Sequence, residues 1–156
     1  MLIKTKTEYT ADGNYPLKSY DAKGYVVTRE MDTDYTLKSV TDPVGQKVEY
    51  GYDDSKRVEL VKTSVTVNGV EKVYKNEYIY DADRLKTVKH NTTDNNNCDV
   101  IYTFGYDALG RKTTVKVGNQ VLSTNVYSDD RNGILKEVQY GNGGKVSYEH
   151  DDFDRI

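Results

Sequence analysis

Two histidines, one cysteine and one acidic turn are the residues of this chain whose types could support catalysis or metal binding. His90 has no cysteine or second histidine at the spacing of a zinc site. Cys98 stands alone, which excludes an intrachain disulfide, and no histidine or basic cluster adjoins it to activate the thiol. The segment Asp129–Gly133 starts like a calcium loop, but its acceptor spacing fails and no glutamate stands at the twelfth position of an EF-hand. The sequence therefore predicts no catalytic residue, no metal site, no cofactor and no enzyme.

Tyrosine, by contrast, recurs in a pattern: an aromatic residue, one residue, a second aromatic residue, Asp, and then a turn. Residues two apart on a strand share a face, so each phrase places two rings side by side before the turn. A looser copy runs from Tyr20 to Gly24, and a weaker one begins at Tyr127. The full phrases are Tyr50–Asp53, Tyr78–Asp81, Phe104–Asp107 and Tyr148–Asp151, and in the last of them His150 takes a slot that tyrosines fill elsewhere.

The residues around each phrase have a physical logic. The Asp side chain can accept backbone N–H groups of the following turn, and Gly24 and Gly110 can take the positive φ that closes it. The Arg after the turn begins the next strand, where its stem can cover neighbouring rings and its guanidinium can pair with Asp or stack on Tyr. We predict ladders of rings from copy to copy. The structural motif residues are Tyr20, Asp21, Gly24, Tyr50, Tyr52, Asp53, Arg57, Tyr78, Tyr80, Asp81, Arg84, Phe104, Tyr106, Asp107, Gly110, Arg111, Tyr127, Tyr148, His150, Asp151 and Arg155.

Alternation and turn signals between the phrases predict an all-β chain. Val65–Val73 reads as a strand, an Asn-Gly turn and a strand, because Asn and Gly best tolerate the positive φ of a type I′ turn. Val115–Leu122 and Val138–Val146 give two further hairpins, and Asp42–Gly45 is a turn candidate. We expect a dozen or so short antiparallel strands, hairpin-linked, and almost no helix.

Composition limits the function classes. The net charge is −3 with acid and base interleaved, and no basic face is concentrated enough for nucleic acid. No segment approaches the roughly 18 apolar residues that span a bilayer, so we expect no membrane insertion by this segment. The first residues lack the apolar core of a signal peptide. The mean hydropathy is −0.80, yet fifteen tyrosines with many valines and threonines favour strands over disorder.

The stretch Tyr106–Arg111 resembles the signature of the YD repeats, also called RHS (rearrangement hotspot) repeats. Tyr52–Arg57, Tyr80–Leu85 and Asp151–Ile156 are degenerate copies, and Val40–Asp53 is similar to the spacing between copies in that family. The copies follow in order from about Tyr20 to the end of the sequence.

The resemblance implies a structural role. In this family long arrays coil into a hollow β-shell, as in bacterial polymorphic toxins, insecticidal toxin complexes and teneurins, and bacterial shells enclose a toxic domain. We therefore expect residues 1–156 to be a single array segment, an excerpt of a longer protein that is secreted or at the cell surface. It would contribute a twisted, extended sheet as part of such a shell. The expected partners are neighbouring repeats and, through exposed sheet edges, further copies of this chain. The alternative is a carbohydrate- or surface-binding module that uses exposed tyrosine ladders.

Overall fold

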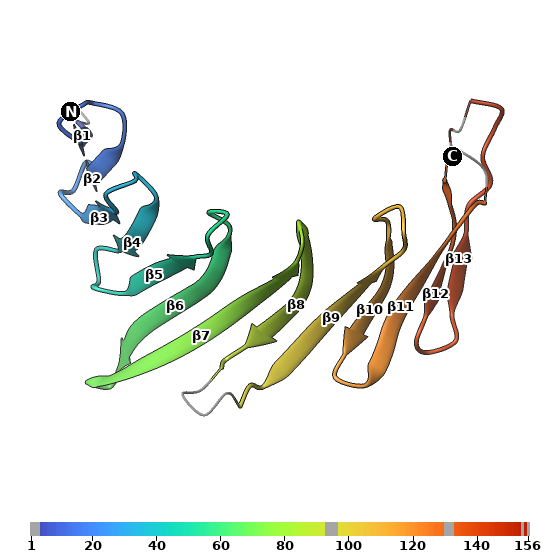
Figure 1. The fold of residues 1–156 in the computed structure, drawn as a ribbon. Helices are drawn as coiled ribbons and strands as arrows, with labels where there is room; N and C mark the ends of the chain where they lie inside the picture. The colour runs from blue at the N-terminus through green and yellow to red at the C-terminus, as the bar shows by residue number, and fades with distance from the viewer. Residues whose placement is uncertain (1–3, 93–96, 130–132, 154, 156) are drawn as a thin grey trace. The chain divides into compact units, whose positions relative to one another are not determined.

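The fold is all-β and antiparallel, as predicted, in a computed structural model that describes residues 4–92, 97–129, 133–153 and 155 (Figure 1). No helix occurs in these ranges, and therefore none that could cross a membrane. The hydrogen-bonded order of the strands follows the chain from β1 to β13. The strands are β1 Lys6–Tyr9, β2 Pro16–Tyr20, β3 Val26–Met31, β4 Leu37–Thr41, β5 Lys47–Tyr52, β6 Val58–Val67, β7 Val70–Asp81, β8 Arg84–His90, β9 Val100–Tyr106, β10 Lys112–Val117, β11 Gln120–Tyr127, β12 Leu135–Tyr140 and β13 Lys145–Ser147.

The chain forms two compact units. Unit 1 comprises Met1–Glu77 with Asn91–Asn97, and unit 2 comprises Tyr78–His90 with Cys98–Ile156. Strands β1 to β6 lie in unit 1 and β8 to β13 in unit 2, while β7 contributes its first part to unit 1 and its last residues to unit 2.

In unit 1, one face of the sheet carries charged and polar side chains, because alternate residues of a strand point to the same face. On one face of β5 lie Lys47 and Glu49, which form an ion pair of 3.3 Å, and Lys62 on β6 pairs with Glu49 at 2.9 Å. On the neighbouring strands of this face, the Ser39 hydroxyl donates to Glu30 at 2.8 Å and is almost fully buried beneath these long side chains. Because acids face bases across adjacent strands, this face is held by cross-strand pairs.

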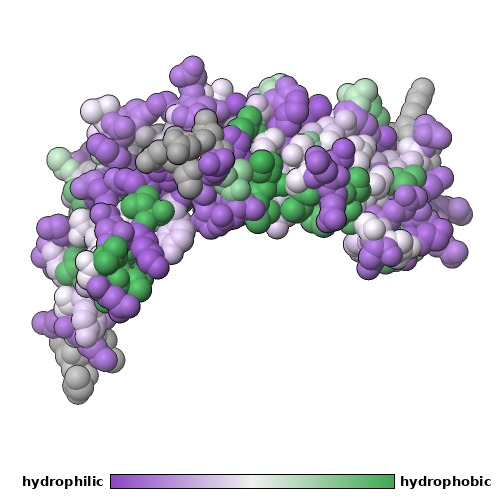
Figure 2. All heavy atoms as spheres, turned by 90° about the horizontal axis from the view of Figure 1, so that it is seen from below, coloured by the Kyte–Doolittle hydropathy of each residue, from purple (hydrophilic) through white to green (hydrophobic). Residues whose placement is uncertain are grey.

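Unit 2 places its rings and aliphatic side chains on one face. Tyr102 on β9 lies opposite Val88 on β8 and Val117 on β10, and Phe104 lies opposite Val115. Val88 is the only buried hydrophobic residue among the described residues. Hydrophobic atoms therefore appear on the surface as patches between hydrophilic ones (Figure 2). The backbone ladder and contacts between neighbouring strands hold the fold, rather than a thick core.

The predicted turns are confirmed. Val67 pairs with Val70 across Asn68 and Gly69, whose φ values of 52° and 77° are those of a type I′ turn. The turn after Asp42 closes with the Gly45 N–H donating to the Asp42 carbonyl at 3.1 Å.

Candidate functional site

Most of the predicted motif residues gather at turns along one edge of their unit. Each antiparallel strand crosses from one edge to the other, so turns two strands apart share an edge. In unit 2 this rule places the turns after Asp81, Asp107, Tyr127 and Asp151 on one edge. In unit 1 the turn after Tyr52 shares an edge with the turn after Met31.

The looser copy Tyr20–Gly24 lies on the opposite edge of unit 1 from Tyr52 and Asp53, because three strands separate the two turns. The turn Asp32–Thr36, which the aromatic phrase did not identify, is the one that shares the edge of Asp53. Met31 precedes Asp32 at the position that an aromatic residue takes in the phrases, so the aromatic pattern does not identify this turn. The signal that could have found it is an Asp two strands before Asp53.

The Asp-turns have the predicted geometry. The backbone N–H of the Asp donates to the carbonyl four residues on, from Asp53 to Arg57 at 2.9 Å and from Asp107 to Arg111 at 3.0 Å. In return the Asp53 carboxylate accepts the N–H groups of Ser55 and Arg57, both at 2.9 Å. The fourth residue of the turn is left-handed, with φ of 84° at Gly110 and 87° at Gly24, as expected.

Arginine closes three of these turns. The Arg57 Nε donates to Asp53 at 2.8 Å, and the corresponding distances are 2.6 Å from Arg111 to Asp107 and 2.8 Å from Arg155 to Asp151. The hydrogen bond from Arg57 lowers the pKa of Asp53, and that from Arg155 lowers the pKa of Asp151. These carboxylates are thus held in their charged form.

The phrase tyrosines bind the preceding strand through their hydroxyls. Tyr52 donates to the Leu37 carbonyl at 2.9 Å, Tyr106 to the Leu85 carbonyl at 2.8 Å, and Tyr127 to the Lys112 carbonyl at 2.9 Å. In each case the acceptor is the first or second residue of the strand that leaves the neighbouring turn on the same edge. Each hydroxyl therefore ties one turn to the next.

Arginine completes this joint between turns, as predicted for its guanidinium. Arg84 lies over the Tyr106 ring at 5.7 Å, and Arg111 lies over the Tyr127 ring at 4.5 Å. Arg84 also lies against Gly110, where an added Cβ would be 2.5 Å from its Nη2 atom. We name the set of Arg84, Leu85, Tyr106 and Gly110 the turn joint. The close approach to glycine was not predicted.

The expected ladder of phrase rings is not what the ring contacts show. Within the described residues, stacking joins Tyr15 to Tyr35 at 5.1 Å, and an edge contact joins His90 to Tyr102 at 5.6 Å. The rings of Tyr106 and Tyr127 carry guanidinium groups instead. Cation–π contacts replace ring–ring contacts because the arginine of one turn reaches the tyrosine of the next.

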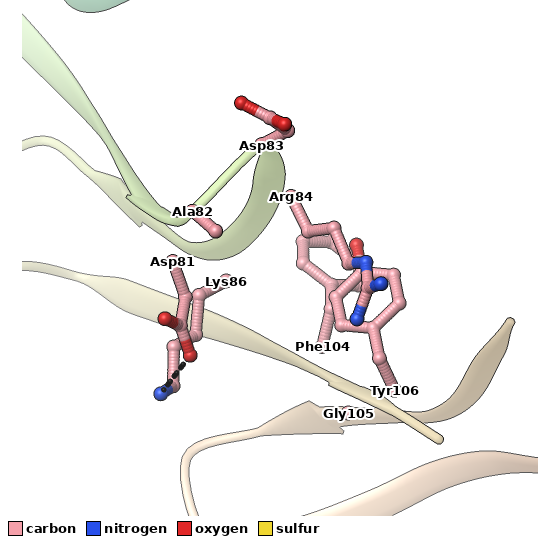
Figure 3. Close-up of a pocket in the computed structure, with 8 residues that line it drawn as sticks. All are labelled: Asp81, Ala82, Asp83, Arg84, Lys86, Phe104, Gly105 and Tyr106. Carbon is pink, nitrogen blue, oxygen red and sulfur yellow. Dashed lines mark hydrogen bonds and ion pairs between the residues drawn. The ribbon is translucent and has the colours of Figure 1, made fainter. Parts of the chain in front are cut away.

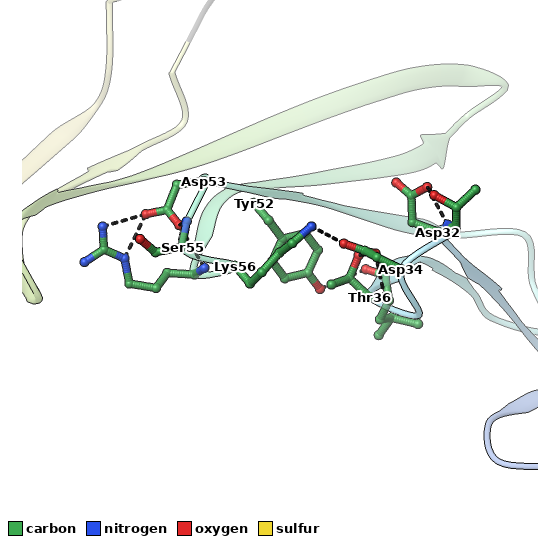
Figure 4. Close-up of polar contacts among 10 residues, drawn as sticks. Asp32, Asp34, Thr36, Tyr52, Asp53, Ser55 and Lys56 are labelled. Carbon is green, nitrogen blue, oxygen red and sulfur yellow. Dashed lines mark hydrogen bonds and ion pairs between the residues drawn. The ribbon is translucent and has the colours of Figure 1, made fainter.

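In unit 1 a lysine bridges turns on the same edge (Figure 4). Lys56, at the left-handed position of its turn, forms an ion pair with Asp34 in the neighbouring turn. The hydrogen bond from Lys56, with further bonds from Thr36, lowers the pKa of Asp34 well below its usual range. Figure 4 shows Tyr52 between the two turns.

A cleft of about 390 Å³ lies beside the turn joint in unit 2 (Figure 3). Its floor is formed by Phe104 and Tyr106 of β9, and Arg84 and Lys86 of β8 flank it. The Lys86 ammonium pairs with Asp81 at 2.8 Å, which lowers the pKa of that carboxyl. The cleft therefore combines two aromatic rings with two basic and two acidic side chains.

Other predicted residues are not among those that line the cleft. The Tyr20 hydroxyl donates to Glu8 at 3.2 Å, and the Tyr148 N–H donates to the Lys136 carbonyl at 2.8 Å. Cys98 is half-buried. Within the described ranges no three His, Cys, Asp or Glu residues converge as metal ligands, and residues 130–132 of the acidic turn lie outside those ranges.

Comparison with known proteins supports the fold. No family model matches the chain, and no curated protein matches it by sequence. Among solved structures, the chain is similar to a chain of TcdB2-TccC3-TEV, with a TM-score of 0.58 and 16% identity over 94% of this chain. It is also similar to TcdB2-TccC3 without its hypervariable C-terminal region, with a TM-score of 0.55 and 17% identity over 96% of this chain. This chain spans about 10% of the length of each. At these identities the likeness is one of fold: an antiparallel β-repeat array.

Proposed function

We propose that the chain is a non-enzymatic structural segment of a large secreted or cell-surface YD/RHS-repeat protein. In that protein it forms part of the wall of a β-shell that encloses or presents an effector domain. The observation that carries this proposal is the attachment of neighbouring turns to one another: the hydroxyls of Tyr52, Tyr106 and Tyr127 each bind the strand that leaves the neighbouring turn, and the turn joint is one example. The YD-like motifs and the fold shared with a small part of much longer chains support it.

A deletion in the longer repeat protein that contains this segment tests this role. Residues 107–127 form one complete repeat from turn to turn on one edge, so their removal joins Tyr106 to Ser128 and keeps the strand order. We expect the wall to be shortened and the enclosed domain to become sensitive to limited proteolysis. A control that replaces exposed Tyr140 with alanine should leave protection intact. Unchanged protection after the deletion would contradict the proposal.

A second candidate function is glycan binding at the cell surface, and the cleft over Phe104 and Tyr106 favours it. Aromatic rings offer their faces to the apolar faces of pyranose rings, and this cleft exposes two rings side by side on one strand. A glycan array probed with the chain and with a Phe104→Ala variant tests this function. The absence of any retained glycan would refute it.

A further inference from the structure

We propose that the cleft beside the turn joint binds an acidic sugar, through a carboxylate on Arg84 and a pyranose face on Phe104 and Tyr106. This inference rests on the second candidate function and names its ligand class. The chain as a whole is acidic, with a net charge of −3. The cleft is lined by two bases, Arg84 and Lys86, and by two acids, Asp81 and Asp83, and Asp81 pairs with Lys86. The case for an anionic ligand therefore depends on Arg84 and on Lys112, which lies next to the cleft over Phe104.

One cation lies over each of the two rings. Arg84 lies over Tyr106 at 5.7 Å, and the Lys112 ammonium lies over Phe104 at 5.9 Å. Lys86 is offset by Asp81, but within the described residues neither Arg84 nor Lys112 forms an ion pair. Figure 3 shows the Asp83 carboxylate directed away from the Arg84 guanidinium. Positive charge on Arg84 and Lys112 is thus available to a ligand.

The guanidinium of Arg84 is already oriented. Its face is used by the Tyr106 ring and its Nη2 lies against Gly110, where no side chain intervenes. A cation–π contact occupies the face of a guanidinium and leaves the N–H groups at its edge, which are the donors that bind a carboxylate in a bidentate manner. Because the side chain is held before the ligand arrives, little rotamer entropy is lost on binding.

The rings select the rest of the ligand. Phe104 and Tyr106 are half-buried, share one face of β9 and line the cleft, so the parts of the rings that Arg84 and Lys112 leave uncovered present a small apolar surface. A bare inorganic anion would leave this surface unused. A uronic acid has a carboxylate and an apolar ring face on one pyranose, and it matches both features.

Titration of the 156-residue chain with trigalacturonate tests the inference, with maltotriose as the neutral probe and inorganic phosphate as the bare anion. We expect trigalacturonate to shift the NMR signals of the Arg84 Nε–H and of the Phe104 and Tyr106 rings. We expect maltotriose and phosphate to bind at least about tenfold more weakly, since each lacks one of the two features. Raising the salt concentration should weaken trigalacturonate binding, because the charges are exposed.

Variants locate the site. Arg84→Gln should weaken trigalacturonate binding about tenfold or more, and Lys112→Gln by a few-fold. Lys116→Gln is the matched control, because Lys116 lies opposite Thr103 on the other face of the same strand, and it should bind like the unmodified chain. Thermal unfolding of each variant checks the fold, and Lys112→Gln keeps the test valid if Arg84→Gln is destabilised.

Several results would overturn the inference. If phosphate bound as tightly as trigalacturonate, the sugar ring would not contribute to recognition. If maltotriose bound as tightly, the carboxylate would not contribute. Unchanged affinity in both the Arg84 and Lys112 variants would place the ligand elsewhere. If a glycan array retained only neutral sugars, glycan binding would stand while this assignment failed.

Discussion

Replacing Gly110 with alanine distinguishes the contribution of the turn joint to stability from that of the turn's own left-handed backbone. Gly110 and Gly143 occupy the same position of equivalent turns in unit 2, with φ of 84° and 87°, and each N–H donates to the carbonyl three residues back. An added Cβ at Gly110 meets the Arg84 guanidinium at 2.5 Å, whereas at Gly143 it meets nothing within 4 Å. The Gly143→Ala variant is therefore a matched control.

The magnitudes follow from these contacts. Both alanines must take a left-handed backbone, which costs roughly 1–2 kcal/mol in either turn. At Gly110 the flexible end of Arg84 must also move off the Tyr106 ring, which costs a further ~0.5–1 kcal/mol for an exposed cation–π contact. We expect Gly110→Ala to lower the free energy of unfolding by this additional amount relative to Gly143→Ala.

Urea denaturation of both variants measures the difference, and an Arg84→Ala background completes a double-mutant cycle. In that background the two glycine substitutions should cost the same, because the clash and the ring contact are both absent. The contact between Arg84 and Gly110 would be refuted if Gly110→Ala and Gly143→Ala lowered the free energy of unfolding equally in the unmodified chain. It would also be refuted if the larger loss at Gly110 persisted in the Arg84→Ala background.

Tyr127→Phe removes the hydrogen bond to the Lys112 carbonyl and should lower the free energy of unfolding by about 0.5–1.5 kcal/mol, while Tyr140→Phe should change it little. Asp53→Ala should unfold at lower urea than Asp53→Asn, because the amide oxygen can still accept the two turn N–H groups; equal midpoints would refute this. Hydrogen bonds from Arg57, Lys62 and Lys145 lower the pKa values of Asp53, Glu49 and Glu137, so the stability from these pairs is complete above about pH 5 and is lost as the pH falls through the folded-state pKa values; a urea midpoint constant from pH 7 to pH 3 would contradict it. The outer strands β1 and β13 should support concentration-dependent association, and light scattering that shows a monomer at high concentration would exclude it.

The strands and turns could be predicted because their signals are local. Asn68 with Gly69, and Asp107 with Gly110, fix the turn within four residues, and alternation fixes the strands between. The turn joint could be predicted only in part, because its members come from turns two strands apart. The pairing of Arg111 with Asp107 lies within one turn, but the reach of Arg84 to Gly110 depends on strand register.

The edge of each turn could not be predicted from the phrase alone. Tyr20 and Tyr52 look equivalent in sequence, but an odd number of strand crossings puts them on opposite edges. Register shifts between Gly51 and Tyr52, and between Val126 and Tyr127, also lie just before the phrase turns. Such bulges increase the local twist and re-aim side chains, and the sequence carries no simple signal for them.

The order of the strands has a kinetic consequence. Since each strand pairs with its predecessor and successor along the chain, the contacts that define the fold close short loops. All-β proteins commonly fold slowly because their strands must find partners distant in sequence, and this chain avoids that search. A ribosome that releases it hairpin by hairpin would always present the next strand with an edge already formed. Growth of the sheet can then keep pace with synthesis, and the contacts between neighbouring turns can form as soon as the following turn emerges.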